Sequence, residues 1–217
     1  MSLWNYYLNN DKRIIDKWTH YFPIYERFLA PWVNKTVNFL EIGVSEGGSL
    51  QMWKSYLGPL STIVGVDIDP SCKQIEENGI KIRIGDQSSE SFLTSLVDEF
   101  GTFDVVIDDG SHQMAQVNAS FQFLYPKISK NGVYLVEDLH CAYDRSYGGG
   151  LGETASFIEK SKHFIDLMHS EFAELPHPNM FSALTRSIQF YPGVVVFERG
   201  SLSFRHIGRT GRVLRQP

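Results

Sequence analysis

Short apolar runs alternate with amphipathic segments through the middle of the chain. The runs are rich in β-branched residues and cover 37–43, 61–67, 80–84, 105–107 and 132–136. Helical patterns separate them, at about 49–56, at a short segment after Pro70, at about 89–100 and at about 113–126. Strands alternating with helices at this spacing predict right-handed crossovers and a mostly parallel sheet.

The end of the chain predicts a different kind of pairing. Ser156 and Glu159 form a capping-box pattern that predicts a helix reaching to about residue 174. Two extended runs follow, 186–191 and 194–198, and Pro192-Gly193 between them suits a tight turn. We therefore expect an α/β fold with seven strands, in which a parallel sheet ends in an antiparallel hairpin. The glycine-rich run 148–152 predicts a loop.

The first 36 residues carry an aromatic pattern of helical spacing. Trp18, Tyr21, Tyr25 and Phe28 recur every three or four residues, with Pro23 interrupting the series. This predicts one or two amphipathic helices with a break before the proline. We expect three regions: a helical cap over 1–36, the main domain over 37–200 and a tail over 201–217. The cap would cover a sheet edge or join a subunit interface, and a lid over a substrate is the alternative.

Composition narrows the classes of function. The 217 residues carry a net charge of −5, which gives no reason to expect nucleic-acid binding. Four arginines near the end (Arg205, Arg209, Arg212 and Arg215) are expected to lie on a solvated tail. Two cysteines without a CxxC spacing argue against a disulfide framework or a zinc site. With no long apolar run and no signal peptide, we expect a cytoplasmic protein without a membrane span.

The first predicted strand ends in a loop that favours a cationic ligand. The loop 41–48 lacks the GxGxxG pattern, and Glu41 and Glu46 would repel a pyrophosphate. S-adenosylmethionine carries a sulfonium and an amino group, so it suits these carboxylates better. Gly43 and Gly47 would let the backbone approach it closely. Asp67, at the end of the second strand, is expected to bind ribose hydroxyls.

Two more acidic residues follow predicted strands on the same side. Asp86 ends the third strand and could accept a hydrogen bond from an adenine amine. Asp108 ends the fourth strand, where it would face the cofactor or cap the next helix. Taken singly, acidic residues at strand ends are often merely solvated. Their sequential order is what favours a cofactor site.

A second acidic group predicts a metal site. Asp109 follows the fourth strand, and Glu137 and Asp138 follow the fifth, so three hard oxygen donors meet if these strands pair. Mg²⁺ prefers such ligands and would polarise an acceptor hydroxyl. His112 lies three residues after Asp109 and could take the proton as a neutral base. Helix capping and a surface histidine remain ordinary explanations for each residue alone, but three clustered carboxylates without a cation would repel one another.

These motifs resemble a known family. Residues 37–200 are similar to class I S-adenosylmethionine-dependent methyltransferases with a Rossmann-like sheet. The sequences DDGSH at 108–112 and ED at 137–138 resemble metal-dependent sugar O-methyltransferases of macrolide, aminocoumarin and rhamnosyl pathways, and the related cephalosporin-hydroxylase-type group. The resemblance implies that Asp109, Glu137 and Asp138 bind Mg²⁺, that His112 is the base, and that the acceptor is a sugar hydroxyl. The large N-terminal region of the macrolide enzymes has no counterpart in this chain.

Other functions stay open at this point. His140, Tyr143 and Tyr147 follow the fifth strand and could contact the acceptor or simply pack the loop. A catechol also presents two adjacent oxygens to Mg²⁺, and a binding module without catalysis is a further alternative. A nicotinamide-dependent oxidoreductase is disfavoured by the glutamates of the first loop. We expect a small-molecule or glycan acceptor and a homo-oligomer.

Overall fold

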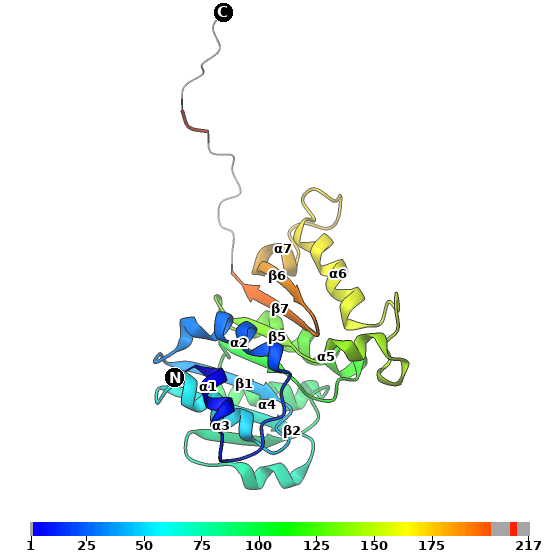
Figure 1. Cartoon of the computed structure of the whole chain (residues 1–217). Helices are drawn as coiled ribbons and strands as arrows, with labels where there is room; N and C mark the ends of the chain where they lie inside the picture. The colour runs from blue at the N-terminus through cyan, green and yellow to red at the C-terminus, as the bar shows by residue number, and fades with distance from the viewer. Residues whose placement is uncertain (1, 201–208, 212–217) are drawn as a thin grey trace, which may run out of the picture.

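The computed structural model describes residues 2–200 and 209–211 and contains one seven-stranded sheet (Figure 1). The strands follow one another in the spatial order β3-β2-β1-β4-β5-β7-β6. Their bounds are β1 (Val37–Ile42), β2 (Ser61–Asp67), β3 (Ile80–Ile84), β4 (Val105–Asp108), β5 (Val133–Val136), β6 (Thr185–Tyr191) and β7 (Val194–Arg199).

The pairing confirms the predicted architecture. Strands β1 to β5 pair in parallel, whereas β7 is antiparallel to both β5 and β6. All five parallel strands therefore end at the same edge of the sheet. From β1 the next strands along the chain, β2 and β3, are added on one side of the sheet, whereas β4 and β5 are added on the other side. The order of strands therefore reverses between β1 and β4, and open α/β sheets bind ligands at such a switch point.

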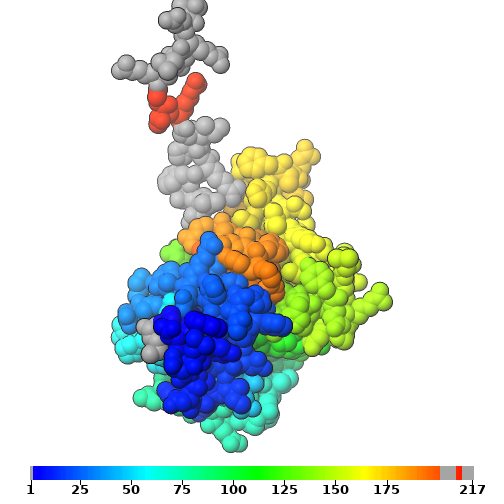
Figure 2. Space-filling view, in the orientation of Figure 1, coloured from blue at the N-terminus to red at the C-terminus, as the bar shows by residue number. Residues whose placement is uncertain are grey.

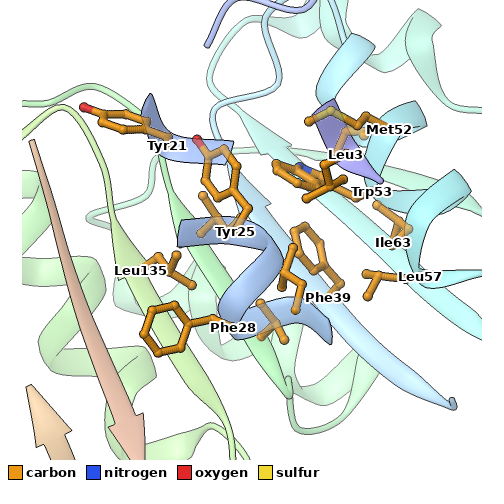
Figure 3. Packing of buried hydrophobic residues seen from close by; sticks show 14 of the residues in the cluster. Leu3, Tyr21, Tyr25, Phe28, Phe39, Met52, Trp53, Leu57, Ile63 and Leu135 are labelled. Atoms are coloured by element: carbon orange, nitrogen blue, oxygen red, sulfur yellow. The ribbon is translucent and has the colours of Figure 1, made fainter. Parts of the chain in front are cut away.

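One face of the sheet is covered by the N-terminal helices and the first crossover helix. These are α1 (Leu3–Leu8), α2 (Phe22–Leu29) and α3 (Gly48–Leu57). Figure 3 shows Tyr25 and Phe28 of α2 and Trp53 of α3 lying over the sheet, where they pack against Phe39 of β1. Burying these large aromatic side chains supplies much of the hydrophobic stabilisation on this face.

The opposite face carries the other helices. They are α4 (Glu90–Phe100), α5 (Met114–Leu124), α6 (Phe157–Met168) and α7 (Met180–Leu184). Phe121 of α5 stacks on Tyr125 and contacts Phe197 of β7, with ring centroids 4.4 Å apart in the second pair. Successive strand residues face opposite sides, so Phe39 and Leu40 of β1 belong to different cores. The predicted helix over 156–174 ends earlier, at Met168, and α7 was not predicted.

Helices α1 and α2 confirm the predicted N-terminal helices, but the residues between them depart from the helical pattern. Residues 9–18 join α1 to a 3₁₀ turn at Thr19–Tyr21 without forming a helix, and Pro23 lies in the first turn of α2 rather than interrupting it. In Figure 2 this part of the chain (blue) covers much of the visible face. The segment crosses the start of α3, where a Cβ on Gly48 would lie 2.2 Å from the Ile14 carbonyl oxygen. This crossing leaves Ile14 and Trp18 exposed, although the helical spacing placed Trp18 on an apolar face.

Three further expectations can be compared with the structure. Both cysteines are buried and free. Among the described residues, no helix is long and apolar enough to cross a membrane. The basic residues of the predicted tail, apart from Arg209, lie outside the described residues.

Candidate active site

A cavity of about 720 Å³ lies at the carboxyl ends of β1, β2, β4 and β5. The segment that precedes α2 forms its remaining wall. The lining residues are Ile14, Asp16, Lys17, Trp18, Thr19, Tyr21, Gly43, Val44, Ser45, Glu46, Ser49, Asp67, Asp109, Gly110, His112, Glu137, Asp138 and His140. The strand ends therefore bring most of the predicted site residues to one cavity.

Asp67 fixes the shape of the first loop. Its Oδ2 accepts hydrogen bonds from the backbone N–H groups of Val44 at 2.9 Å and Ser45 at 3.1 Å, and its Oδ1 accepts from Asp69. Burial raises the pKa of Asp67, but these backbone donors outweigh it and lower the pKa below its usual value. The residue predicted to bind ribose is therefore an ionised carboxylate at the cavity wall.

Gly43 was predicted to let the backbone approach the cofactor closely, and in the structure the group that lies close to it is the backbone of Asp109. Gly43 has φ +93°, and a Cβ there would lie 2.0 Å from the Asp109 carbonyl oxygen. The loops after β1 and β4 can therefore meet only with glycine at this position. Gly47, with φ +75°, instead approaches the side chain of Ile75 and does not line the cavity.

A smaller cavity of about 180 Å³ adjoins the main one, sharing Gly43, Asp67 and Gly110 with it. Asp86 lines it together with Ile68. The Oδ1 of Asp86 accepts from both the N–H and the hydroxyl of Ser88, which lowers the pKa of Asp86. A polar carboxylate beside an apolar wall is a suitable place for a purine ring with an exocyclic amine.

Asp108 is not brought to either cavity. Its side chain is only 1 % exposed and accepts hydrogen bonds from Gln87, Ser120 and Tyr134. Burial raises the pKa of Asp108 to about 6, although its hydrogen bonds oppose the shift. Asp108 was predicted to contact the cofactor or to cap the next helix. In the structure it instead binds other buried side chains below the cavity. Gln87, held by Asp108, accepts a hydrogen bond from the Ser111 N–H and so fixes the turn before His112.

Lys17 lies at the centre of an ionic cluster that sequence reasoning missed. Its Nζ is 2.5 Å from Asp109 Oδ2, 3.1 Å from Glu137 Oε2 and 3.2 Å from Glu41 Oε1. Burial alone would lower the pKa of Lys17, but the surrounding carboxylates raise it well above its usual value, so the ammonium stays charged. Nothing in the sequence distinguishes Lys17 from its neighbour Lys12, since its partners come from distant strands.

Glu41 and Glu137 form the inner part of this cluster. Both are almost fully buried, and burial raises the pKa of each, with Lys17 opposing the shift. Glu41 also accepts a hydrogen bond from Ser49 at 2.7 Å. Glu41 does not line the cavity, whereas it was predicted to contact the cofactor.

A second group of donors lies on the open side of Asp109. One side-chain atom from each of Asp109, His112 and Asp138 can be chosen so that all three lie within 4.8 Å of one another. His112 Nε2 is 4.0 Å from Asp109 Oδ1 and 3.8 Å from Asp138 Oδ2, too far for a hydrogen bond. Tyr21 donates a hydrogen bond to Asp138 Oδ1 at 3.0 Å. Two carboxylates and an imidazole at this spacing suit a divalent cation.

The backbone conformation of His112 and of Asp138 is unusual. His112 has φ 57° and Asp138 has φ 52°, both in the left-handed region that residues other than glycine rarely adopt. Such conformations cost free energy and persist where the surrounding structure holds them, often at functional sites. Both residues line the cavity, and Glu137, which precedes Asp138, pairs with Lys17.

The predicted acceptor residues are separated in space. His140 lines the main cavity, with its ring 5.8 Å from that of Trp18, and Tyr147 lies 6.5 Å from His112 between ring centroids. Tyr143 instead lines a neighbouring groove of about 550 Å³ that also contains His140 and Phe190. Trp18 on the N-terminal segment was not predicted as a site residue, yet it forms part of the cavity wall.

Comparisons with known proteins place this architecture in a family. Residues 40–139 match a family model described as a methyltransferase domain. The fold matches the MycE methyltransferase from the mycinamycin biosynthetic pathway, solved with Mg, SAH and mycinamycin VI, with a TM-score of 0.81 and 32 % identity. That match covers 92 % of this chain and 53 % of the MycE chain. The sheet is therefore that of the Rossmann-like class I methyltransferases, and residues 40–139 are similar to a methyltransferase domain.

Within that class, the relatives act on sugars of natural products. The chain is 35 % identical over 201 residues to an 8-demethyl-8-(2-methoxy-alpha-L-rhamnosyl)-tetracenomycin-C 3'-O-methyltransferase of Streptomyces olivaceus, a match covering 85 % of this chain and 51 % of the relative. It is 35 % identical over 196 residues to a mycinamicin VI 2''-O-methyltransferase of Micromonospora griseorubida, covering 83 % and 48 %. The chain spans about half the length of these relatives, and among class I methyltransferases it is similar to this sugar O-methyltransferase group.

Proposed function

We propose that the protein is a divalent-cation-dependent O-methyltransferase that transfers a methyl group from S-adenosylmethionine to a sugar hydroxyl of a small-molecule glycoside or glycan. The observation that carries the proposal is the convergence of Asp109, His112 and Asp138 beside the cofactor-type loops at the switch point of the sheet. The similarity to sugar O-methyltransferases supports the same conclusion.

The cofactor would occupy the two adjoining cavities. Asp67 and Glu46 line the larger one and are suited to hydroxyl and ammonium groups, and Asp86 lines the smaller one. Asp67 keeps two backbone N–H groups of the first loop in place, so the loop is already shaped before a ligand arrives. Preorganised polar groups reduce the free-energy cost of binding.

The donor set fits Mg²⁺ or Mn²⁺. Asp109 and Asp138 provide hard oxygen atoms at the cavity, and we propose Glu137 as the third carboxylate ligand. A bound divalent cation would polarise the acceptor hydroxyl and lower its pKa. The structure places Glu137 against Lys17, so its use as a ligand requires that contact to be released.

His112 is the proposed general base. Its ring lies at the cavity and makes no hydrogen bond with either neighbouring carboxylate, so a nitrogen atom is free to accept the hydroxyl proton. The hydrogen-bonded turn through Ser111 and Gln87 fixes its position. A base placed in this way contributes roughly 10²- to 10⁴-fold to the rate of such proton transfers.

The decisive experiment is methyl transfer from S-adenosylmethionine to a panel of glycosides and catechols, with and without a chelator. We expect transfer to glycosides that stops when the divalent cation is removed and returns when Mg²⁺ or Mn²⁺ is added. Cofactor binding, followed by calorimetry, should persist in the chelated protein. Turnover that is insensitive to the chelator would contradict the role of the metal, and cofactor binding without transfer to any acceptor would favour a binding module.

A further inference from the structure

Two side chains of the N-terminal segment reach the acidic strand ends: Tyr21 donates to Asp138, and Lys17 is the cation that pairs with Glu41, Asp109 and Glu137. The Lys17 side chain is only 4 % exposed, and its Nζ contacts carboxylates from three strands, β1, β4 and β5. Residues 14–19 around it lie between α1 and α2 and have little regular structure of their own. These contacts therefore connect the wall of the cofactor cavity to the proposed metal ligands.

Two of the three carboxylates that hold Lys17 are proposed metal ligands. The ammonium is 2.5 Å from Asp109 Oδ2 and 3.1 Å from Glu137 Oε2, which are distances for direct hydrogen bonds. A divalent cation bound to the same two carboxylates would lie close to the ammonium and be repelled by it. The two cations therefore compete for the negative charge of these two carboxylates.

Lys17 also compensates the negative charge of the carboxylates around it. Glu41 and Glu137 are buried. Asp109 contacts Lys17 and also belongs to the group of possible metal donors with His112 and Asp138. Burying such charges is unfavourable unless they are paired with an opposite charge. Lys17 supplies that charge and pairs directly with all three carboxylates.

Resting on the function proposed above, we propose that Lys17 is a positioning residue that occupies the cation position of the acidic cluster in the metal-free enzyme and yields Asp109 and Glu137 to the divalent cation. Metal binding then releases the inner anchor of residues 14–19, which form a wall of the cofactor cavity. The proposal concerns the exchange of two cations, and Lys17 stays charged in both states.

The first test measures the affinity for Mn²⁺ by electron paramagnetic resonance in the wild-type protein and in Lys17→Met. We expect Lys17→Met to bind Mn²⁺ at least about tenfold more tightly, because a competing cation has been removed. Lys17→Arg keeps the charge and should remain much nearer to the wild type. Lys12→Met, a change at an exposed lysine of the same segment, should leave the affinity unchanged.

The second test needs no variant and therefore holds even if Lys17→Met does not fold. Hydrogen–deuterium exchange of residues 10–21 is compared in the wild-type protein with and without saturating Mg²⁺. We expect faster exchange in this segment when Mg²⁺ is bound, since its inner anchor is released. A role for Lys17 that is only structural would leave the exchange unchanged or slow it.

The outcomes separate the two proposals. Wild-type binding of Mn²⁺ with equal or weaker binding by Lys17→Met, or Mg²⁺-induced protection of residues 10–21, would overturn the exchange while leaving the proposed function intact. Absence of Mn²⁺ binding in both proteins would overturn both proposals. Binding by Lys17→Met alone would support the exchange in its strongest form.

Discussion

Two regions form the candidate active-site cavity, and different kinds of contact hold them in place. The ends of β1, β2, β4 and β5 deliver side chains through a regular parallel sheet, whose pairing fixes which strand ends are neighbours. Residues 9–21 reach the same cavity as an irregular segment held by a few specific contacts, chiefly those of Lys17 and the crossing at Gly48. The sheet supplies the proposed chemistry, whereas the segment supplies a wall and a cation.

The two regions differ in how many contacts hold each of them in place. Asp109, the residue after β4, is held to the end of β1 by a backbone hydrogen bond from its N–H to the Ile42 carbonyl. The N-terminal segment has no such pairing with a strand, so one ionic anchor or one close backbone contact carries much of its placement. We therefore expect changes at the strand ends to affect catalysis itself and changes under the segment to affect the binding of the cofactor.

The largest effect on turnover is expected at the strand ends, from His112→Gln. Loss of the base should lower turnover by about 100-fold or more at neutral pH. Affinity for Mn²⁺ should remain close to that of the wild type, because the carboxylates provide the proposed ligands. Steady-state kinetics and Mn²⁺ titration on the same preparation measure both quantities.

The control for this change is His163→Gln, at an exposed histidine of α6 that should tolerate it without effect. A large loss of Mn²⁺ affinity in His112→Gln would contradict the assignment as a base. It would instead make His112 a metal ligand, as its spacing from Asp109 and Asp138 also permits.

A smaller effect is expected in the segment, from Gly48→Ala. The added Cβ would lie 2.2 Å and 2.4 Å from the carbonyl oxygens of Ile14 and Arg13, so the segment must move away from α3. We expect roughly tenfold weaker binding of S-adenosylmethionine, about 1.4 kcal/mol, with faster cleavage by trypsin at the basic residues of the segment. Calorimetry and limited proteolysis measure these changes.

The matched control is Ser55→Ala, an exposed position on the same helix, which should leave both measurements unchanged. Unaltered cofactor affinity in Gly48→Ala, with proteolysis accelerated, would show that the segment is a wall without energetic importance for the cofactor. The strand ends would then be needed for catalysis, and the N-terminal segment would be needed neither for catalysis nor for cofactor binding.

The sequence predicted the sheet and its acidic ends because these depend on local patterns. Apolar runs such as Val105–Ile107 are short and bounded by polar residues, and parallel pairing brings their ends to a common edge. The separation of Glu137 from Asp138 could not be predicted in this way. Glu137 pairs with Lys17 and Asp138 with Tyr21, and both partners come from an N-terminal segment more than 100 residues earlier in the chain.

The path of residues 9–18 between the two N-terminal helices was mispredicted for a physical reason that these residues do not reveal. The aromatic spacing around Trp18 and Tyr21 is compatible with a helix, but tertiary contacts prevail over that pattern. Lys17 pairs with carboxylates 92 and 120 residues away, and only the folded sheet brings those together. A lone lysine among aromatic residues gives no signal of such a partner.

The smallest effect on turnover is expected beneath the strand ends, from Asp108→Asn, because this carboxyl does not line the cavity. Its effect should be visible in stability. The pKa of Asp108 is about 6 in the folded protein, against an ordinary value of 3.8. Between these two values the folded state keeps a proton that the unfolded state releases, so this carboxyl's contribution to stability is fully present below pH 4 and is lost as the pH rises through 6.

In Asp108→Asn that contribution is absent, and the free energy of unfolding should fall less steeply between pH 4 and 6 than in the wild type. The difference amounts to about 3 kcal/mol at most, from about 1.4 kcal/mol for each pKa unit. Urea unfolding of the chelated proteins over pH 4–8 measures it. Identical pH dependence in the two proteins would mean that Asp108 is ionised in the folded state across this range. The hydrogen bonds from Gln87, Ser120 and Tyr134 would then outweigh its burial.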